Sequence, residues 1–373
     1  MIDDLIRCLP KSETLTFNVV ENVLEFAKIL KKVFPYSVVA YVCELSQTQF
    51  IPILKRATLE QGISLISIVV DKNKVNCIDT LADVFSLPEN VRGIIAMHSG
   101  VLSACKYLAH YRSLPLFLLV ADGVDNRLIS DSALIRTSIS EANILNVPCE
   151  KKVYLLKDNI ASNEFIVHTI ENLLCGCTCL VDYILSLAYC GKMPNEMAFG
   201  VLRDVVCAIN AVKGNDYDKL TYHALHSQVY GASIKGYYNI CTCDVIFRLK
   251  NARFGAYECA YVLEKYERLF NGKANNLPNY TERARAVSLT LGIDYFMALK
   301  GIKAQIKKYA NPDIQGFRAQ FDDIYGVFIE LLRVYKELGG KVENSGNASV
   351  IALAGDTPFG INGMSLLREK YLV

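Results

Sequence analysis

The residues whose types and position are best suited to bind a ligand form a short turn, Met97-His98-Ser99-Gly100. This turn lies between a buried apolar run and a helical pattern. Free backbone N–H groups and the positive end of a helix dipole meet where such a strand passes into a helix, so phosphate groups bind there. Glycines usually line the turn because the ligand must approach the backbone closely. Here only Gly100 remains. His98, Ser99, Gly100 and Ser103 are therefore candidate cofactor-binding residues of a vestigial or rebuilt loop, and the alternative for His98 is a polar residue that caps the helix or faces solvent.

Two further clusters contain residue types that bind metals. His223 and His226 share a helix face, but a zinc site needs at least one more ligand, so ordinary helix-surface histidines are the favoured interpretation. Cys175 and Cys179 also share a helix face, whereas Cys177 points away from them. This spacing favours core packing over a metal or redox role.

Composition excludes several classes of protein. The chain has 373 residues, of which 52% are hydrophobic and 21% charged, and its net charge of +2 gives no basic field for nucleic acid or a membrane surface. No uninterrupted apolar run reaches the roughly 20 residues of a membrane span. Asp3 and Asp4 interrupt the beginning of the chain, so no secretory leader is expected. The 13 cysteines include no CxxC pair, which predicts a reduced, cytoplasmic protein.

The elements that must position these residues alternate over the first 150 positions or so. Apolar, β-branched runs predict buried strands at Ser37–Cys43, Ser64–Val70, Ile94–Met97 and Leu116–Val120. Helical patterns fall between and around them, at Glu21–Val33, Ile51–Gln61, Cys77–Phe85 and Val101–Tyr111. Strands that alternate with helices predict a doubly wound parallel sheet, a Rossmann-like α/β fold.

The second half of the chain is predicted to be all-helical. Helical spacing recurs at Glu164–Leu187, Met197–Ala211, Phe254–Phe270, Tyr280–Ile293 and Ile314–Leu338. A strand at Lys152–Leu156 precedes it, and one more strand-like run follows at Ser349–Ala354. We therefore predict an α/β domain over residues 1–155 and a helical domain over residues 156–373.

Three segments, taken in order, resemble one protein family. The unit from Leu87 to Asn126, with its Lys106-Tyr107 helix, is similar to the cofactor unit of glycerol-1-phosphate dehydrogenases. Ser162–Tyr183 and Ala252–Tyr266 resemble two helices of the second domain of those enzymes. They belong to the superfamily of iron-containing alcohol dehydrogenase, glycerol dehydrogenase and dehydroquinate synthase. The resemblance implies a dehydroquinate synthase-like fold, NAD(P) as cofactor and a homodimer.

The cofactor motifs of that family are altered here. A Gly-Gly-Gly-Ser/Lys-x-x-Asp turn holds the dinucleotide pyrophosphate in the family, and the matching positions here begin at Met97, with Ser103 in place of the aspartate. A Cβ at each former glycine crowds the pyrophosphate space. In the next loop, Asn126 stands where the resemblance places an acidic residue that contacts cofactor and substrate. No bound cofactor is therefore the favoured expectation, although the resemblance leaves NAD(P) open.

The metal ligands of the family, one Asp and two His, are also replaced. Asn172 falls on the Asp position, and Phe254 on the final His. The middle His falls within residues 235–238, which hold no histidine. Lys235 is the candidate catalytic residue, because a lysine can polarise a carbonyl or bind a phosphate, and its alternative is a solvated surface side chain. Asn172 remains a candidate for substrate binding together with Asn126, and metal binding is not expected.

These changes together predict a diverged glycerol-1-phosphate dehydrogenase-like protein. It is expected to have lost metal binding and hydride transfer, and to act as a binding or regulatory protein toward a small molecule or protein that the sequence does not identify. One alternative is an active NAD(P)-dependent oxidoreductase on a polyol or polyol phosphate with a rebuilt site. Another is a metal-free lyase or synthase in the same cleft.

Overall fold

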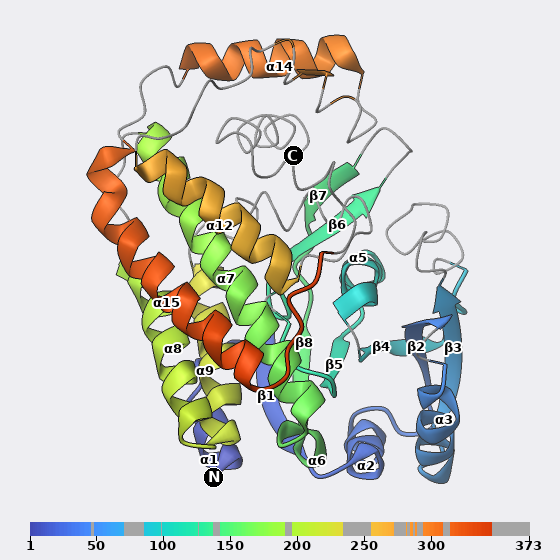
Figure 1. Cartoon of the computed structure of the whole chain (residues 1–373). Helices are drawn as coiled ribbons and strands as arrows, with labels where there is room; N and C mark the ends of the chain where they lie inside the picture. Colours follow the sequence, from blue (N-terminus) through green and yellow to red (C-terminus); the bar gives the residue numbers. More distant parts are fainter. Residues whose placement is uncertain are drawn as a thin grey trace.

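The protein is described from a computed structural model (Figure 1). The described residues are 1–45, 48–70, 86–97, 99–125, 127–136, 142–190, 196–233, 255–271, 281, 284–285, 288, 294–308 and 314–344. Helices gather on one side of the molecule, and a sheet with its own covering helices lies on the other (Figure 1).

A six-stranded sheet of order β1-β8-β5-β4-β2-β3 forms the centre of the α/β part. All of its strand pairs are parallel. Its strands are β1 (Leu15–Val20), β2 (Val38–Glu44), β3 (Ser64–Val70), β4 (Val91–Ala96), β5 (Leu116–Val120) and β8 (Lys151–Leu156). A separate antiparallel hairpin consists of β6 (Ser132–Arg136) and β7 (Ala142–Asn146).

The continuous apolar strands are explained by burial on both sheet faces. In β5, Phe117 and Leu119 pack with α2 (Val23–Val33) and α3 (Phe50–Glu60), whereas Leu116 and Leu118 face the opposite core. That second core includes α5 (Leu102–Tyr111) and α7 (Asn163–Cys190). Because β4 and β5 are adjacent and parallel, their carboxyl ends lie at one edge of the sheet, beside α5 and α7.

The helical part is arranged around α7. Its neighbours are α8 (Glu196–Lys213), α9 (Tyr217–Ser233), α12 (Ala256–Phe270) and α15 (Arg318–Glu337), and the short helices α1 (Ile2–Arg7) and α6 (Lys157–Ile160) also contact α9. A further helix, α14 (Tyr295–Lys308), lies at the end of the molecule drawn uppermost in Figure 1. Among the described helices, one window in α7, Asn163–Leu185, is long and apolar enough to cross a membrane, but 67% of it is buried inside the protein. This is the composition of a core helix, and it is weak evidence for a span.

The predicted fold class is confirmed, and so are the four predicted strands of the first half and the strand before the helical part. No sequence pattern predicted α1, β1, α6, β6 or β7, and the helical ranges predicted for the second half omit α14 and include α9 only as the helix that carries His223 and His226. The predicted helix at Cys77–Phe85 and the strand at Ser349–Ala354 lie outside the described residues, as does most of the helix at Tyr280–Ile293.

Candidate functional site

The carboxyl ends of β4 and β5, the loop after β5 and the first half of α7 enclose a cavity of about 40 Å³. Its polar lining consists of Asp122, Asp125, His168 and Asn172. Ligands of open parallel sheets bind at this edge, so the cavity is the candidate site. A space of this size holds about three water molecules.

The loop after β5 is fixed to α7 by direct contacts. The carbonyl oxygen of Asp122 lies 2.9 Å from Nδ1 of His168, and the backbone N–H of Val124 donates to Oγ1 of Thr169 at 3.1 Å. Between them, Gly123 has φ of 136° in the left-handed region, and a Cβ there would lie 2.7 Å from Cβ of His168. Only glycine permits so close an approach. The loop therefore closes the space between the sheet and α7.

A second attachment reaches the same loop from α9. Gln228 donates from Nε2 to the carbonyl oxygen of Asp125, and its Oε1 accepts from the backbone N–H of Ile129 at 3.4 Å. Its side chain is buried. Two helices of the helical part, α7 and α9, thus hold the loop through its backbone atoms.

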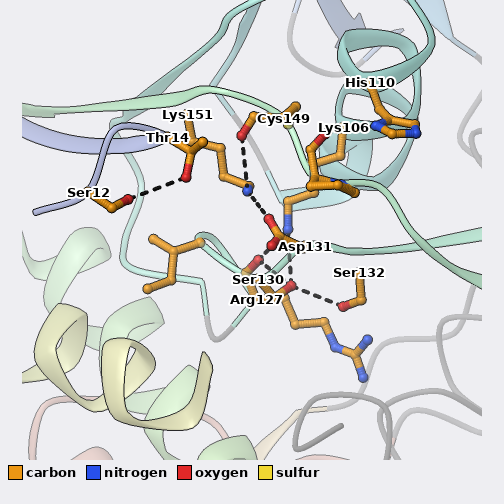
Figure 2. A network of polar contacts seen from close by, with 12 residues as sticks. Ser12, Thr14, Lys106, His110, Arg127, Ser130, Asp131, Ser132, Cys149 and Lys151 are labelled. Atoms are coloured by element: carbon orange, nitrogen blue, oxygen red, sulfur yellow. Dashed lines mark hydrogen bonds and ion pairs between the residues drawn. The ribbon is translucent and has the colours of Figure 1, made fainter. Parts of the chain in front are cut away.

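Beneath the loop, a buried lysine on α5 anchors its far end (Figure 2). Nζ of Lys106 donates to the carbonyl oxygen of Arg127 at 2.6 Å and to Oγ of Ser130 at 3.2 Å. Burial is the largest cause of a pKa for Lys106 well below the usual lysine value, and the charge of Lys151 lowers it further. Lys151 is itself paired with Asp131. Lys106 lines none of the described cavities, so its observed role is to position the loop.

Asn172 lies where the cavity meets a second one. The second cavity, of about 30 Å³, lies between α7, α8 and α9 and is also lined by Asn172. Nδ2 of Asn172 donates to the carbonyl oxygen of His168 at 2.9 Å, within the same helix. A carbonyl oxygen can only accept, so the amide nitrogen faces it with one of its two N–H groups, and the neutral Oδ1 remains as acceptor.

The described residues do not fit a catalytic metal ion. Such sites use three protein ligands from histidine, cysteine and carboxylate side chains. No group of three or more such side chains that could hold a metal occurs in the described part of the chain. Within the cavity, Nδ1 of His168 faces the carbonyl oxygen of Asp122, which leaves only Nε2 of that ring as a coordinating atom.

The turn at the start of α5 also differs from a nucleotide-binding turn. Residues Ser99–Val101 form a 3-10 turn that leads into α5, and Ser103 lies in the first turn of the helix. The carboxylate of Glu44, the last residue of β2, packs on Gly100: a Cβ at Gly100 would collide with Oε1 of Glu44 and lie 3.0 Å from its Cδ. An acidic side chain of the chain itself therefore lies at the point where the fold places a ligand phosphate.

Several predicted site residues cannot be placed. His98, Asn126, Lys235 and Phe254 lie outside the described residues. Of the predicted residues that are described, Asn172 lines the cavity, and Ser99, Gly100 and Ser103 are at the start of α5, which follows the cavity-lining Met97.

The two other predicted clusters do not form metal sites in the described structure. His223 and His226 each place Nδ1 2.9 Å from one oxygen of Asp204, a buried residue of α8. Burial raises the pKa of Asp204, but the hydrogen bonds from both histidines outweigh it, so the pKa is below its usual value. Cys175, Cys177 and Cys179 of α7 are buried, and Sγ of Cys175 lies 3.7 Å from Sγ of Cys259 on α12.

Sequence reasoning missed Glu44, Asp204 and Gln228. The sequence did contain a signal for Glu44, because this residue follows a predicted strand that a parallel sheet places near the turn at Met97. Asp204 and Gln228 had no such signal, since only the packing of α8 and α9 onto their neighbours shows what they contact.

Comparison with known proteins supports the fold and nothing finer. No protein-family model matches the sequence, and no curated protein matches it significantly. An iron-containing alcohol dehydrogenase from Thermotoga maritima is similar in structure, with 12% identity over 96% of this chain and 98% of its own, at a TM-score of 0.55. An alcohol dehydrogenase from Oenococcus oeni is similar with 10% identity over 88% of this chain and 86% of its own, at a TM-score of 0.53. The chain therefore has the dehydroquinate synthase-like fold of the iron-containing dehydrogenases.

Proposed function

We propose that this chain is a diverged member of the glycerol-1-phosphate dehydrogenase-like group that no longer carries out metal-dependent hydride transfer and instead acts as a binding or regulatory protein. The observation that carries the proposal is the state of the cleft. Asn172, where the resemblance places a carboxylate metal ligand, has its amide bonded to the backbone of its own helix and lies between two small cavities.

The chemistry of metal-assisted hydride transfer explains why this matters. A bound metal ion polarises the reacting carbonyl or alkoxide and supplies several kcal/mol of charge stabilisation. A neutral amide that already donates to a carbonyl is a poor replacement for a carboxylate ligand. The described cavity offers no other set of ligands, so we infer that this stabilisation has been lost.

The size of the cleft supports the same conclusion for the cofactor. Small-molecule and cofactor sites usually measure about 300–1,000 Å³. The two cavities measure about 40 and 30 Å³, and the contacts of Gly123 and Gln228 hold the loop between them in place. A dinucleotide would have to displace this loop or lie outside it. The protein is therefore better suited to bind a small polar molecule or a macromolecular partner, and we extend the proposal to a cytoplasmic homodimer.

Ligand binding and turnover provide a direct test. Purified protein is titrated with NAD⁺, NADP⁺, Zn²⁺, Ni²⁺ and Fe²⁺ by calorimetry and thermal shift, and its metal content is measured. We expect no saturable binding, substoichiometric metal and no oxidation of NADH with glycerone phosphate. Stoichiometric metal with saturable NAD⁺ binding, or NADH oxidation that depends on added metal, would contradict the proposal and favour an active polyol-phosphate dehydrogenase.

A further inference from the structure

We propose that Glu44 determines the specificity of the turn at the start of α5: its carboxylate takes the place of a ligand phosphate and thereby excludes dinucleotides. The inference rests on the proposed function, because it explains which residue closes the cofactor side of the cleft. It concerns this chain's own side chain and assigns no bound ligand.

The sheet register places Glu44 at the turn. Strands β2 and β4 are adjacent and parallel, and Val42 pairs with Ala96. Glu44 therefore extends two residues beyond that pair, level with the residues that connect β4 to α5. Its Cδ lies 3.0 Å from the position of a Cβ on Gly100, and its Oε2 lies 3.7 Å from it. The carboxyl group thus fills the space that a glycine in this turn leaves open.

Electrostatics explains why a carboxylate is stable at the start of α5. It also explains why the Glu44 carboxylate would exclude a phosphate from the same place. The first turn of a helix carries partial positive charge and backbone N–H groups without helical partners, and these favour any nearby anion. A helix N-terminus binds a phosphate for the same reason. With Glu44 already present, an incoming phosphate meets a like charge and an occupied volume.

An acidic residue after the second strand can also have the opposite effect. In dinucleotide-binding folds such a residue accepts hydrogen bonds from a ribose hydroxyl and so strengthens binding. That role requires the carboxylate to stand clear of the glycine turn, with the pyrophosphate in contact with the turn. Here the carboxylate is in contact with Gly100 itself. The two roles predict opposite signs for the effect of removing Glu44.

The experiment measures binding of NAD⁺ and of inorganic diphosphate to four proteins. These are the wild type, Glu44→Ala, Glu44→Gln and the control Glu89→Ala. Glu89 is an exposed residue at the other end of β4, so its loss changes net charge by the same amount as Glu44→Ala. Circular dichroism and thermal melting verify the fold, and Glu44→Gln, which nearly preserves side-chain volume, serves if Glu44→Ala does not fold.

We expect the wild type and Glu89→Ala to show no binding up to millimolar ligand. Glu44→Ala should bind NAD⁺ and diphosphate at least tenfold more tightly than the wild-type limit, which corresponds to about 1.4 kcal/mol. Glu44→Gln should show a smaller gain because it removes only the charge. If no protein binds either ligand, Glu44 does not close the site, although the proposed function stands. If the wild type binds NAD⁺ and Glu44→Ala weakens it, the inference is wrong, and the proposed function is wrong as well only if the wild type also holds stoichiometric metal or oxidises NADH. Equal gains in Glu44→Ala and Glu89→Ala would mean that net charge alone is responsible, which also overturns the inference.

Discussion

Removal of Asp204 is predicted to weaken the contact between α8 and α9 strongly. The carboxylate is 3% exposed and accepts one hydrogen bond from His223 and one from His226, each 2.9 Å long. A hydrogen bond to a charged group contributes about 1.5–3 kcal/mol. Both imidazoles keep some access to water, at 19% and 17% exposure, so the lower end of that range applies. We expect Asp204→Ala to lower the free energy of unfolding at pH 7 by about 3 kcal/mol.

The effect should depend on pH with a defined sign. The pKa of Asp204 is lower in the folded protein than its usual value of 3.8. Its stabilising contribution is therefore complete above the unfolded-state pKa and is lost as the pH falls through the lower folded-state pKa. The difference between wild type and Asp204→Ala should shrink as the pH falls below about 4.

Urea unfolding followed by circular dichroism, combined with a double-mutant cycle, measures this contribution. His226→Phe serves as the partner change because it retains a ring against Tyr222 and Tyr230 while removing Nδ1. We expect the two substitutions to couple by about 1 kcal/mol or more. Glu60→Ala, which breaks the exposed ion pair with Arg56, is the control and should cause little change. Additive effects of Asp204→Ala and His226→Phe, or a loss no larger than that of Glu60→Ala, would refute the reasoning.

Three further substitutions test the loop and the cleft. Asn172→Asp places a carboxylate oxygen against the carbonyl oxygen of His168, so we expect the free energy of unfolding to fall by about 1–3 kcal/mol and the melting temperature to fall with it. We expect that Zn²⁺ does not restore the melting temperature. If Zn²⁺ stabilises this variant and not the wild type, a metal site survives. Gly123→Ala adds a Cβ 2.7 Å from Cβ of His168, at a position where φ is left-handed. We expect urea unfolding to measure a destabilisation of about 1–3 kcal/mol. An unchanged free energy of unfolding would mean that the loop is not tightly held. In the wild type, the pKa of the buried Lys106 amine is lowered, so the unfolded chain binds this proton more readily than the folded protein does. Wild-type stability should therefore rise as the pH rises toward the usual lysine pKa. Lys106→Met removes the amine. The variant should lack this rise in melting experiments between pH 8 and 10, and equal slopes in both proteins would contradict the burial of the charge.

The sequence was sufficient for the α/β layout because the central parallel strands are buried on both faces. The run Leu116–Val120 is apolar throughout, and its bounds match β5 residue for residue. The missed strands have a different composition. β1 (Leu15–Val20) contains Thr16 and Asn18 at an edge of the sheet, where one side has no neighbouring strand among the described residues. The hairpin of β6 and β7 depends on its packing against α5, which no local pattern records.

The site was less accessible to sequence reasoning because it is assembled from contacts distant in sequence. The identity of Asn172 was readable from the resemblance, but its bond to the backbone of α7 and its place between two cavities were not. Only the structure shows that Gly123 permits the loop to touch α7. Residue types led to the proposal that a metal ligand has been replaced, whereas the packing of α7 and α9 on the loop shows how the loop is held.

The changes proposed at Glu44 and Asn172 affect different steps, namely cofactor binding and metal binding. Substitutions that reverse them should therefore have separate effects. In the proposals above, Glu44 opposes the entry of a phosphate, whereas Asn172 replaces a ligand for the ion that would polarise the substrate. Binding a dinucleotide does not by itself lower the barrier to hydride transfer, because only interactions that strengthen in the transition state do so. A Glu44→Ala protein that gains NAD⁺ should thus remain inactive toward glycerone phosphate, and combining it with Asn172→Asp should add no activity because one carboxylate does not complete a metal site. Turnover by Glu44→Ala alone would show that the chemistry of the cleft is intact and that its cofactor side alone is blocked.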